Sequence, residues 1–188
     1  RDSAVGTMLG NAPLLCGGND EDHSLLDTCI SYHQDSEWTQ THTMVNKRSY
    51  SAGVKVNSTT FWILGGFVNP SCLDSTEFII QGQTNGVPGP KLPYELGYMC
   101  AVKLSEQEIF VIGGIPGPRN EVWIYNPQNA FTRKQGPSMN KGRSKHSCST
   151  MKDGEKTVII VAGGPGFEDS SSTNRWPWFP HDHAAMAE

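Results

Sequence analysis

Histidines and cysteines are the residues of this chain that could bind a metal or act as nucleophiles. The six histidines are spread along the sequence, at His23, His33, His42, His146, His181 and His183. His181 and His183 flank Asp182 in a C-terminal segment, which we interpret as a tail rather than a metal site. No Cys-x-x-Cys pair and no Gly-x-Ser-x-Gly stretch occurs. The sequence therefore predicts no catalytic residues, no metal, no cofactor and no enzyme.

The five cysteines are Cys16, Cys29, Cys72, Cys100 and Cys148. Because five is an odd number, at least one thiol is free or pairs outside this chain. Cys100 and Cys148 fall in apolar strand segments, and we interpret them as buried small hydrophobic residues. Whether Cys16 and Cys29 pair depends on the strands that carry them.

The composition favours a folded domain with many tight turns. Its 188 residues include 20 Gly and 12 Pro, and 36% of them are hydrophobic. The formal net charge of -4 argues against a nucleic acid or an anionic membrane as partner. Apolar runs such as Val158 to Ala162 have the length of a strand, well short of the roughly 18 residues of a membrane-spanning helix.

A Gly-Gly doublet recurs at spacings of 48, 48 and 50 residues, and each doublet ends a short apolar run. The doublets are Gly17-Gly18, Gly65-Gly66, Gly113-Gly114 and Gly163-Gly164. Each repeating unit contains about four short apolar segments separated by polar turns, and no segment shows the 3.6-residue period of a helix. The pattern predicts an all-β repeat architecture.

The doublets have a structural explanation. Glycine adopts positive φ and allows close backbone approach, which a tight turn at a strand end requires. A phosphate-binding loop would lead into a helix N-terminus, and no helical pattern follows any doublet. We therefore interpret these glycines as parts of the repeat and not as a ligand site.

Several features that recur in phase resemble the kelch repeat of β-propellers. Arg48 and Arg143 each lie just before the first predicted strand of a unit, and the next predicted strand of that unit ends in Gly-Gly. Aromatic pairs six residues apart follow two of the doublets, at Tyr32/Trp38 and Tyr125/Phe131. The resemblance covers residues 1 to 166 and implies antiparallel, four-stranded blades. We expect the aromatic pairs to pack between blades.

The repeat boundaries predict three complete blades, at 1–43, 44–91 and 92–138, and the inner hairpin of a fourth at 139–166. Residues 167–188 are expected to be a degenerate strand or a disordered tail. Propellers typically close with 4–8 blades, so the ring is incomplete. We expect the chain to belong to a larger propeller or to associate through exposed blade edges.

The second unit departs from the pattern. Phe78 is interpreted as standing at the tyrosine position, and Leu96 stands where the other units have arginine. Residues 81–90 are rich in Gly and Pro, which predicts a short or displaced outer strand.

Cys16 and Cys29 fall on the predicted second and third strands of one blade, which are antiparallel neighbours. A disulfide across these strands is geometrically possible and would indicate a secreted or lumenal protein. Free thiols would instead favour the cytoplasm. Both locations remain open.

In kelch proteins, an arginine at the position of Arg48 and Arg143 often lies near the central channel. One interpretation is a hydrogen bond to a neighbouring blade, and the other is contact with a partner, in which Lys145 and His146 would share. Both interpretations remain open.

The resemblance implies that the chain binds another protein through loops on one propeller face. Some kelch proteins are substrate adaptors of ubiquitin ligases, others bind actin, and others act outside the cell. Two alternatives remain: part of a propeller-based enzyme of the metal-oxidase type, or a secreted protein with disulfide-braced blades.

Overall fold

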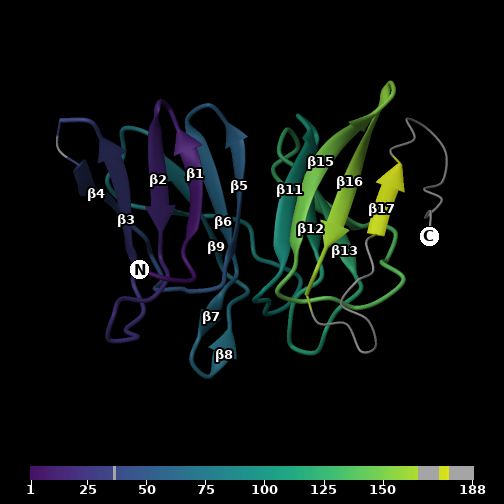
Figure 1. Ribbon diagram of the computed structural model, residues 1–188, viewed down its shortest axis with the longest axis horizontal. Coiled ribbons are helices and arrows are strands. Elements are labelled where there is room, and N and C mark those ends of the chain that lie inside the picture. Colours follow the sequence, from purple (N-terminus) through teal and green to yellow (C-terminus); the bar gives the residue numbers. More distant parts are fainter. Residues whose placement is uncertain (36, 165–173, 178–188) are drawn as a thin grey trace. The chain divides into compact units, whose positions relative to one another are not determined.

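Figure 1 shows the computed structural model, which describes residues 1–35, 37–164 and 174–177. The described residues form strands and no helix, and therefore contain no helix that could span a membrane. The chain divides into two compact units, Arg1–Gly97 and Tyr98–Glu188. Each unit is described by itself.

Unit 1 contains two four-stranded antiparallel sheets, in the orders β1-β2-β3-β4 and β10-β9-β6-β5. A two-stranded hairpin, β7-β8, follows the second doublet. The strands are β1 (Val5–Leu9), β2 (Ala12–Cys16), β3 (Thr28–His33), β4 (Glu37–Thr43), β5 (Ala52–Asn57), β6 (Thr60–Leu64), β7 (Phe67–Val68), β8 (Ser71–Cys72), β9 (Thr76–Ile80) and β10 (Val87–Pro88).

Unit 2 contains a four-stranded sheet, β11-β12-β13-β14, and a three-stranded sheet, β15-β16-β17. The strands are β11 (Cys100–Ser105), β12 (Glu108–Ile112), β13 (Val122–Asn126), β14 (Thr132–Gln135), β15 (Ser147–Asp153), β16 (Lys156–Ala162) and β17 (Asn174–Pro177). Because β17 pairs with β16, the last sheet is more than the expected inner hairpin. Its third strand lies inside the segment expected to be degenerate or disordered. The remaining residues of that segment, 167–173 and 178–188, lie outside the described part of the chain.

The sheets of each unit pack around an apolar core. In unit 1 the core includes Leu14, Phe61 and Ile63, whose exposed fractions are 1% or less. In unit 2 it includes Ile112 and Val161. These residues come from second strands such as β2, β6, β12 and β16, which are apolar because they lie between two other strands of their sheet.

The outer strand of the second sheet, β10, is only two residues long. Its surroundings, residues 81–90, contain three glycines and two prolines, which disfavour a longer strand. The register also corrects one assignment. Phe61 pairs with Ile79 as Ile109 pairs with Tyr125, so Ile79 and not Phe78 stands at the tyrosine position.

The doublets hold consecutive repeats together within each unit. In three doublets the second glycine donates its N–H, at 2.8 Å, to the backbone oxygen at the arginine position of the next repeat; the pairs are Gly18 to Arg48, Gly66 to Leu96 and Gly114 to Arg143. The first glycine has a related constraint. Gly113 has a φ of +63°, and a Cβ atom on it would lie 2.5 Å from the Arg143 carbonyl oxygen. Only glycine tolerates both that backbone conformation and that approach.

Candidate functional site

Arg48 lies buried in unit 1, between β9 and the Gly65 carbonyl. One of its terminal nitrogens, Nη2, is 2.6 Å from Glu77 Oε1, and both side chains are at most 1% exposed. The other, Nη1, donates to the carbonyl oxygens of Gly65 and Ser75. The second Glu77 oxygen accepts the Val45 N–H at 2.7 Å. Burial lowers the pKa of Arg48, and the adjacent Glu77 carboxylate opposes that shift.

Equivalent arginines make the same type of contact in the first and fourth repeats. Arg1 donates to the Gly17 and Thr28 carbonyl oxygens, as Arg48 does to those of Gly65 and Ser75. Arg143 donates to the Gly163 carbonyl oxygen at 2.7 Å and is 1% exposed. In the third repeat Leu96 fills the position and is 1% exposed.

These contacts support the structural interpretation of the arginines. A guanidinium that is 0% or 1% exposed and bonded to main-chain carbonyls presents no donor to a partner. Of the two interpretations left open by the sequence, the burial of Arg48 and Arg143 favours the structural one over contact with a partner. Their hydrogen bonds link the Gly65 and Gly163 carbonyls of the doublets to the segments that precede β5 and β15.

His146 is also buried, with an exposed fraction of 8%. Burial lowers its pKa to about 4; the charge of Arg143 adds to the shift and the nearby Ile112 backbone opposes it. The imidazole is therefore neutral at physiological pH and is unsuited to direct contact with a partner. Burial likewise lowers the pKa of His42, which contacts the Thr41 hydroxyl at 2.9 Å.

Lys145 is the exposed member of the four predicted contact residues. Its ammonium nitrogen lies over the Tyr98 ring, 4.9 Å from the centroid, in a cation–π contact. Its backbone N–H donates to the Tyr98 carbonyl oxygen at 2.9 Å. Both residues have positive φ, +54° for Lys145 and +55° for Tyr98, which is unusual for residues with large side chains.

The same backbone arrangement occurs in unit 1. Tyr50 has a φ of +52°, donates its N–H to the Ser3 carbonyl oxygen at 3.1 Å and is 36% exposed. Ser3 has the same conformation, with a φ of +52°. Each of the four residues lies two positions after the arginine or leucine of its repeat, namely Arg1, Arg48, Leu96 and Arg143.

We call the edge of each unit where the strands end in Gly-Gly the doublet edge; Ser3 and Tyr50 lie on that of unit 1, and Tyr98 and Lys145 on that of unit 2. Backbone conformations of this kind cost about 1–3 kcal/mol each and cluster at functional sites. Sequence reasoning missed Tyr50 and Tyr98. The signal that could have found them is their fixed offset from the arginine position.

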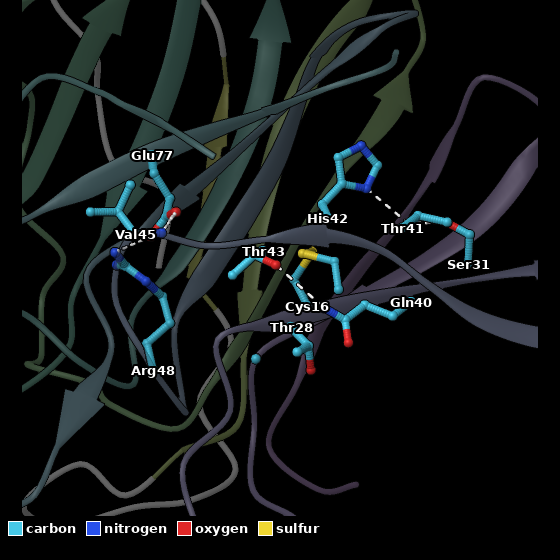
Figure 2. The surroundings of a disulfide bond; sticks show 12 residues. Cys16, Thr28, Ser31, Gln40, Thr41, His42, Thr43, Val45, Arg48 and Glu77 are labelled. Atoms are coloured by element: carbon cyan, nitrogen blue, oxygen red, sulfur yellow. Dashed lines mark hydrogen bonds and ion pairs between the residues drawn. A yellow bond between two sulfur atoms is a disulfide. The ribbon is translucent and has the colours of Figure 1, made fainter. Parts of the chain in front are cut away.

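Cys16 and Cys29 are joined by a disulfide between β2 and β3, with an S–S distance of 2.06 Å. The two residues are direct partners in the strand register and are almost fully buried in the core of unit 1. Figure 2 shows the Arg48–Glu77 pair on one side of Cys16 and the contact between Thr41 and His42 on the other. The disulfide therefore lies within the core that also holds the arginine contact.

Cys100 and Cys148 form a second disulfide, with an S–S distance of 2.13 Å. Their interpretation as free buried thiols is therefore wrong. They lie on β11 and β15, the first strands of two consecutive sheets, and are 48 residues apart in the sequence. The bond links those two sheets covalently. Cys72 remains a free thiol; it is buried, and burial and Glu95 raise its pKa.

Tyr32 and Trp38 form a cross-strand aromatic pair on β3 and β4, with centroids 5.7 Å apart. They are 41% and 46% exposed, so their expected burial between sheets is wrong. Tyr125, by contrast, is fully buried. Trp38 lies on the outermost strand of its sheet, which has one neighbouring strand instead of two. Tyr32 on β3 occupies the same strand position as Tyr125 on β13 and still differs from it in exposure.

Among residues 1–35, 37–164 and 174–177, no group of three or more His, Cys, Asp and Glu side chains is placed to hold a metal ion. His181 and His183 lie outside the described residues.

No protein-family model and no curated protein matches the chain. A solved structure described as that of YjhT is similar to it, with a TM-score of 0.76 and 9% sequence identity. The similarity covers 99% of this chain and 68% of YjhT. YjhT is propeller-like. At this identity the likeness shows the fold alone: antiparallel four-stranded sheets in a propeller-like arrangement of strands.

Proposed function

We propose that this chain is a kelch-type β-propeller module that binds another protein through its doublet edge. The observation that carries the proposal is the set of exposed side chains held on positive-φ backbone at equivalent repeat positions, Tyr50 in unit 1 and Lys145 in unit 2. Each backbone N–H is fixed to the preceding repeat, so the side chain is held in place before a partner arrives. Such preorganisation lowers the entropy cost of binding.

Side-chain chemistry supports a protein partner. Tyrosine is enriched at the centres of protein interfaces, where it offers a large apolar ring and a polar tip. Lysine on a tyrosine ring gives a fixed positive charge next to an apolar surface. In unit 1 the doublet edge also carries the exposed acidic loop residues Glu21 and Asp22. A partner with both apolar and charged side chains fits these surfaces.

We further propose that the protein works in an oxidising compartment, in the secretory lumen or outside the cell. Two disulfides support this location, because cytosolic thiols are kept reduced. Of the alternatives raised by the sequence, the secreted, disulfide-braced protein therefore leads over the cytoplasmic ligase adaptor. The alternative of a metal-dependent propeller enzyme has no observation among the described residues in its favour.

The test compares binding by matched variants of the full chain. Wild type, Tyr50→Ala, Lys145→Ala and Gln107→Ala are immobilised, and bound proteins from an extracellular extract are quantified by mass spectrometry. Gln107 is exposed in the β11–β12 turn, at the edge opposite the doublets, and is the control. A partner of unit 1 is expected to lose about tenfold or more in affinity with Tyr50→Ala, and a partner of unit 2 with Lys145→Ala. Each should keep its affinity for the control. Equal capture by all four proteins would contradict the proposal.

A further inference from the structure

We propose that Asn57 is a site of N-linked glycosylation; this inference rests on the oxidising compartment proposed above. Asn57-Ser58-Thr59 is the only Asn-x-Ser/Thr sequence in the chain whose middle residue is not proline; in Asn69-Pro70-Ser71 the middle residue is proline. This tripeptide is the acceptor for N-glycosylation in proteins that pass through the secretory pathway. The two disulfides support passage of the chain through this pathway.

The acceptor lies in the tight turn between β5 and β6 in unit 1, and all three of its residues are exposed. Asn57 Oδ1 accepts hydrogen bonds from the Thr59 N–H at 2.9 Å and from the Thr59 hydroxyl at 3.1 Å. The amide oxygen is therefore held by Thr59. Among the described residues, Asn57 Nδ2 donates no hydrogen bond, and this is the atom to which a glycan attaches.

The backbone of the turn is held by its neighbours while the side chains stay free of packing. Gly10 donates its N–H to the Ser58 carbonyl oxygen at 3.2 Å, and Gln81 donates its N–H to that of Thr59 at 2.9 Å. A glycan on Nδ2 would break neither of these bonds. The fold can therefore carry the modification without rearrangement.

The transfer balances with one co-substrate, an oligosaccharide linked to a lipid diphosphate, which an oligosaccharyl transferase supplies. A bond forms between Asn57 Nδ2 and C1 of the first sugar, and the bond between C1 and the diphosphate oxygen breaks. The amide gives up one proton and the lipid diphosphate leaves, with no oxidation or reduction. Thr59 is needed because its hydroxyl is part of the acceptor sequence.

The position of the glycan has a consequence for binding. The β5–β6 turn lies at the edge of unit 1 opposite the doublets, whereas the β7–β8 hairpin follows a doublet; Figure 1 shows the two at opposite ends of the strands. Tyr50 precedes β5, and the glycan would be attached to Asn57, the last residue of β5. The modification would cover the opposite edge of unit 1 with sugar and leave the doublet edge open to a partner.

The test expresses the full chain, behind a secretory leader, in eukaryotic cells. The chain is purified from the medium or the lumen and treated in heavy-oxygen water with the amidase that releases N-glycans. Wild type is expected to lose one glycan and to carry labelled aspartate at position 57. Asn57→Asp, which keeps the oxygen that accepts from Thr59 but lacks Nδ2, and Thr59→Ala are expected to carry no glycan. Ser58→Ala preserves the acceptor sequence and is expected to be glycosylated as wild type is.

Counting free thiols in the same samples separates the two proposals. Lumenal wild type with both disulfides formed but no glycan would overturn the glycosylation proposal alone. Wild type with five reactive thiols and no glycan would overturn both this proposal and the oxidising compartment. A glycan that persists in Asn57→Asp would overturn the assignment to Asn57.

Discussion

The Arg48 guanidinium and the Glu77 carboxylate lie 2.6 Å apart and are 0% and 1% exposed. They are 29 residues apart in the sequence, and Glu77 also accepts the N–H of Val45. The pair thus joins the segment before β5 to the middle of the sheet that β5 enters. Because these charges are removed from water, each depends on the other for compensation.

Replacing one member of this pair is expected to destabilise unit 1 strongly. Glu77→Gln would leave the buried Arg48 charge without its counter-ion, at a cost of about 3–5 kcal/mol in the free energy of unfolding. The control is Lys91→Met, because Lys91 contacts Asp74 at 2.8 Å while 74% exposed. An exposed pair contributes about 0–1 kcal/mol. Urea unfolding of both variants makes the comparison, and similar losses would contradict the role given to the buried pair.

The two disulfides are expected to stabilise their units unequally. Their sequence separations are 13 and 48 residues, and a longer closed loop restricts the unfolded chain more. Removing Cys16–Cys29 by double alanine substitution should cost about 3 kcal/mol, and removing Cys100–Cys148 about 4 kcal/mol. Native-state hydrogen exchange measures the loss in each unit separately.

The pattern of affected amides provides the control for this prediction. Cys16→Ala with Cys29→Ala should weaken protection in unit 1 and leave unit 2 near wild type, and the other pair should do the reverse. A larger loss from the shorter loop would show that native packing, rather than chain entropy, dominates the contribution of these bonds.

The doublet spacing carried most of the fold information in the sequence. Regular glycine doublets after apolar runs predict sheets of short strands because both features are local. The Cys16–Cys29 pairing was accessible for the same reason, since adjacent strands of one hairpin determine it. The Cys100–Cys148 bond depends on which strands of different sheets are neighbours, which is not local. Its separation of 48 residues equals the doublet spacing, and this was the overlooked signal.

The site was less predictable than the fold. A sequence shows that Arg48 recurs in phase, but not that Glu77 comes within 2.6 Å of it after folding. The available signal was a single acid inside the apolar strand Thr76–Ile80, because a buried charge requires a partner. Tyr50 and Lys145 gave no composition signal, since positive φ follows from the hydrogen bond to the preceding repeat.

Acid is expected to destabilise unit 2 through His146. Its pKa is lowered to about 4 in the folded chain, against about 6.5 in an unfolded one, so the unfolded state binds more protons between these values. The contribution is fully present above pH 6.5 and is lost as the pH falls towards 4. With about 1.36 kcal/mol for each pKa unit, the loss approaches about 3 kcal/mol. Unfolding free energies measured at pH 7, 6, 5 and 4 should show this decline.

Comparing the pH dependence of the unfolding free energy between two histidine variants separates the effect of His146 from that of other titrating groups. His146→Gln should flatten the decline between pH 6.5 and 4, whereas His23→Gln, at an exposed loop position, should leave the profile as in wild type. A decline of unchanged slope in His146→Gln would assign the acid sensitivity to other residues.

Two glycines with the same backbone conformation separate conformational strain from close approach. Gly113 and Gly117 have φ values of +63° and +65°, but only at Gly113 would a Cβ atom meet neighbours, the nearest being the Arg143 oxygen at 2.5 Å. Gly117→Ala should therefore cost about 1–2 kcal/mol from the left-handed conformation alone. Gly113→Ala should cost about 1–3 kcal/mol more, because it forces the doublet away from Arg143.

Urea unfolding of the two variants gives this difference directly. If the Gly113–Arg143 approach holds consecutive sheets together, Gly113→Ala should also weaken hydrogen-exchange protection at the Gly114 N–H, which donates to Arg143 at 2.8 Å. Gly117→Ala should leave that amide protected. Equal stability losses, with Gly114 protected in both variants, would mean that the first glycine is selected for its φ alone and that the packing of the doublet against the next repeat adds no stability.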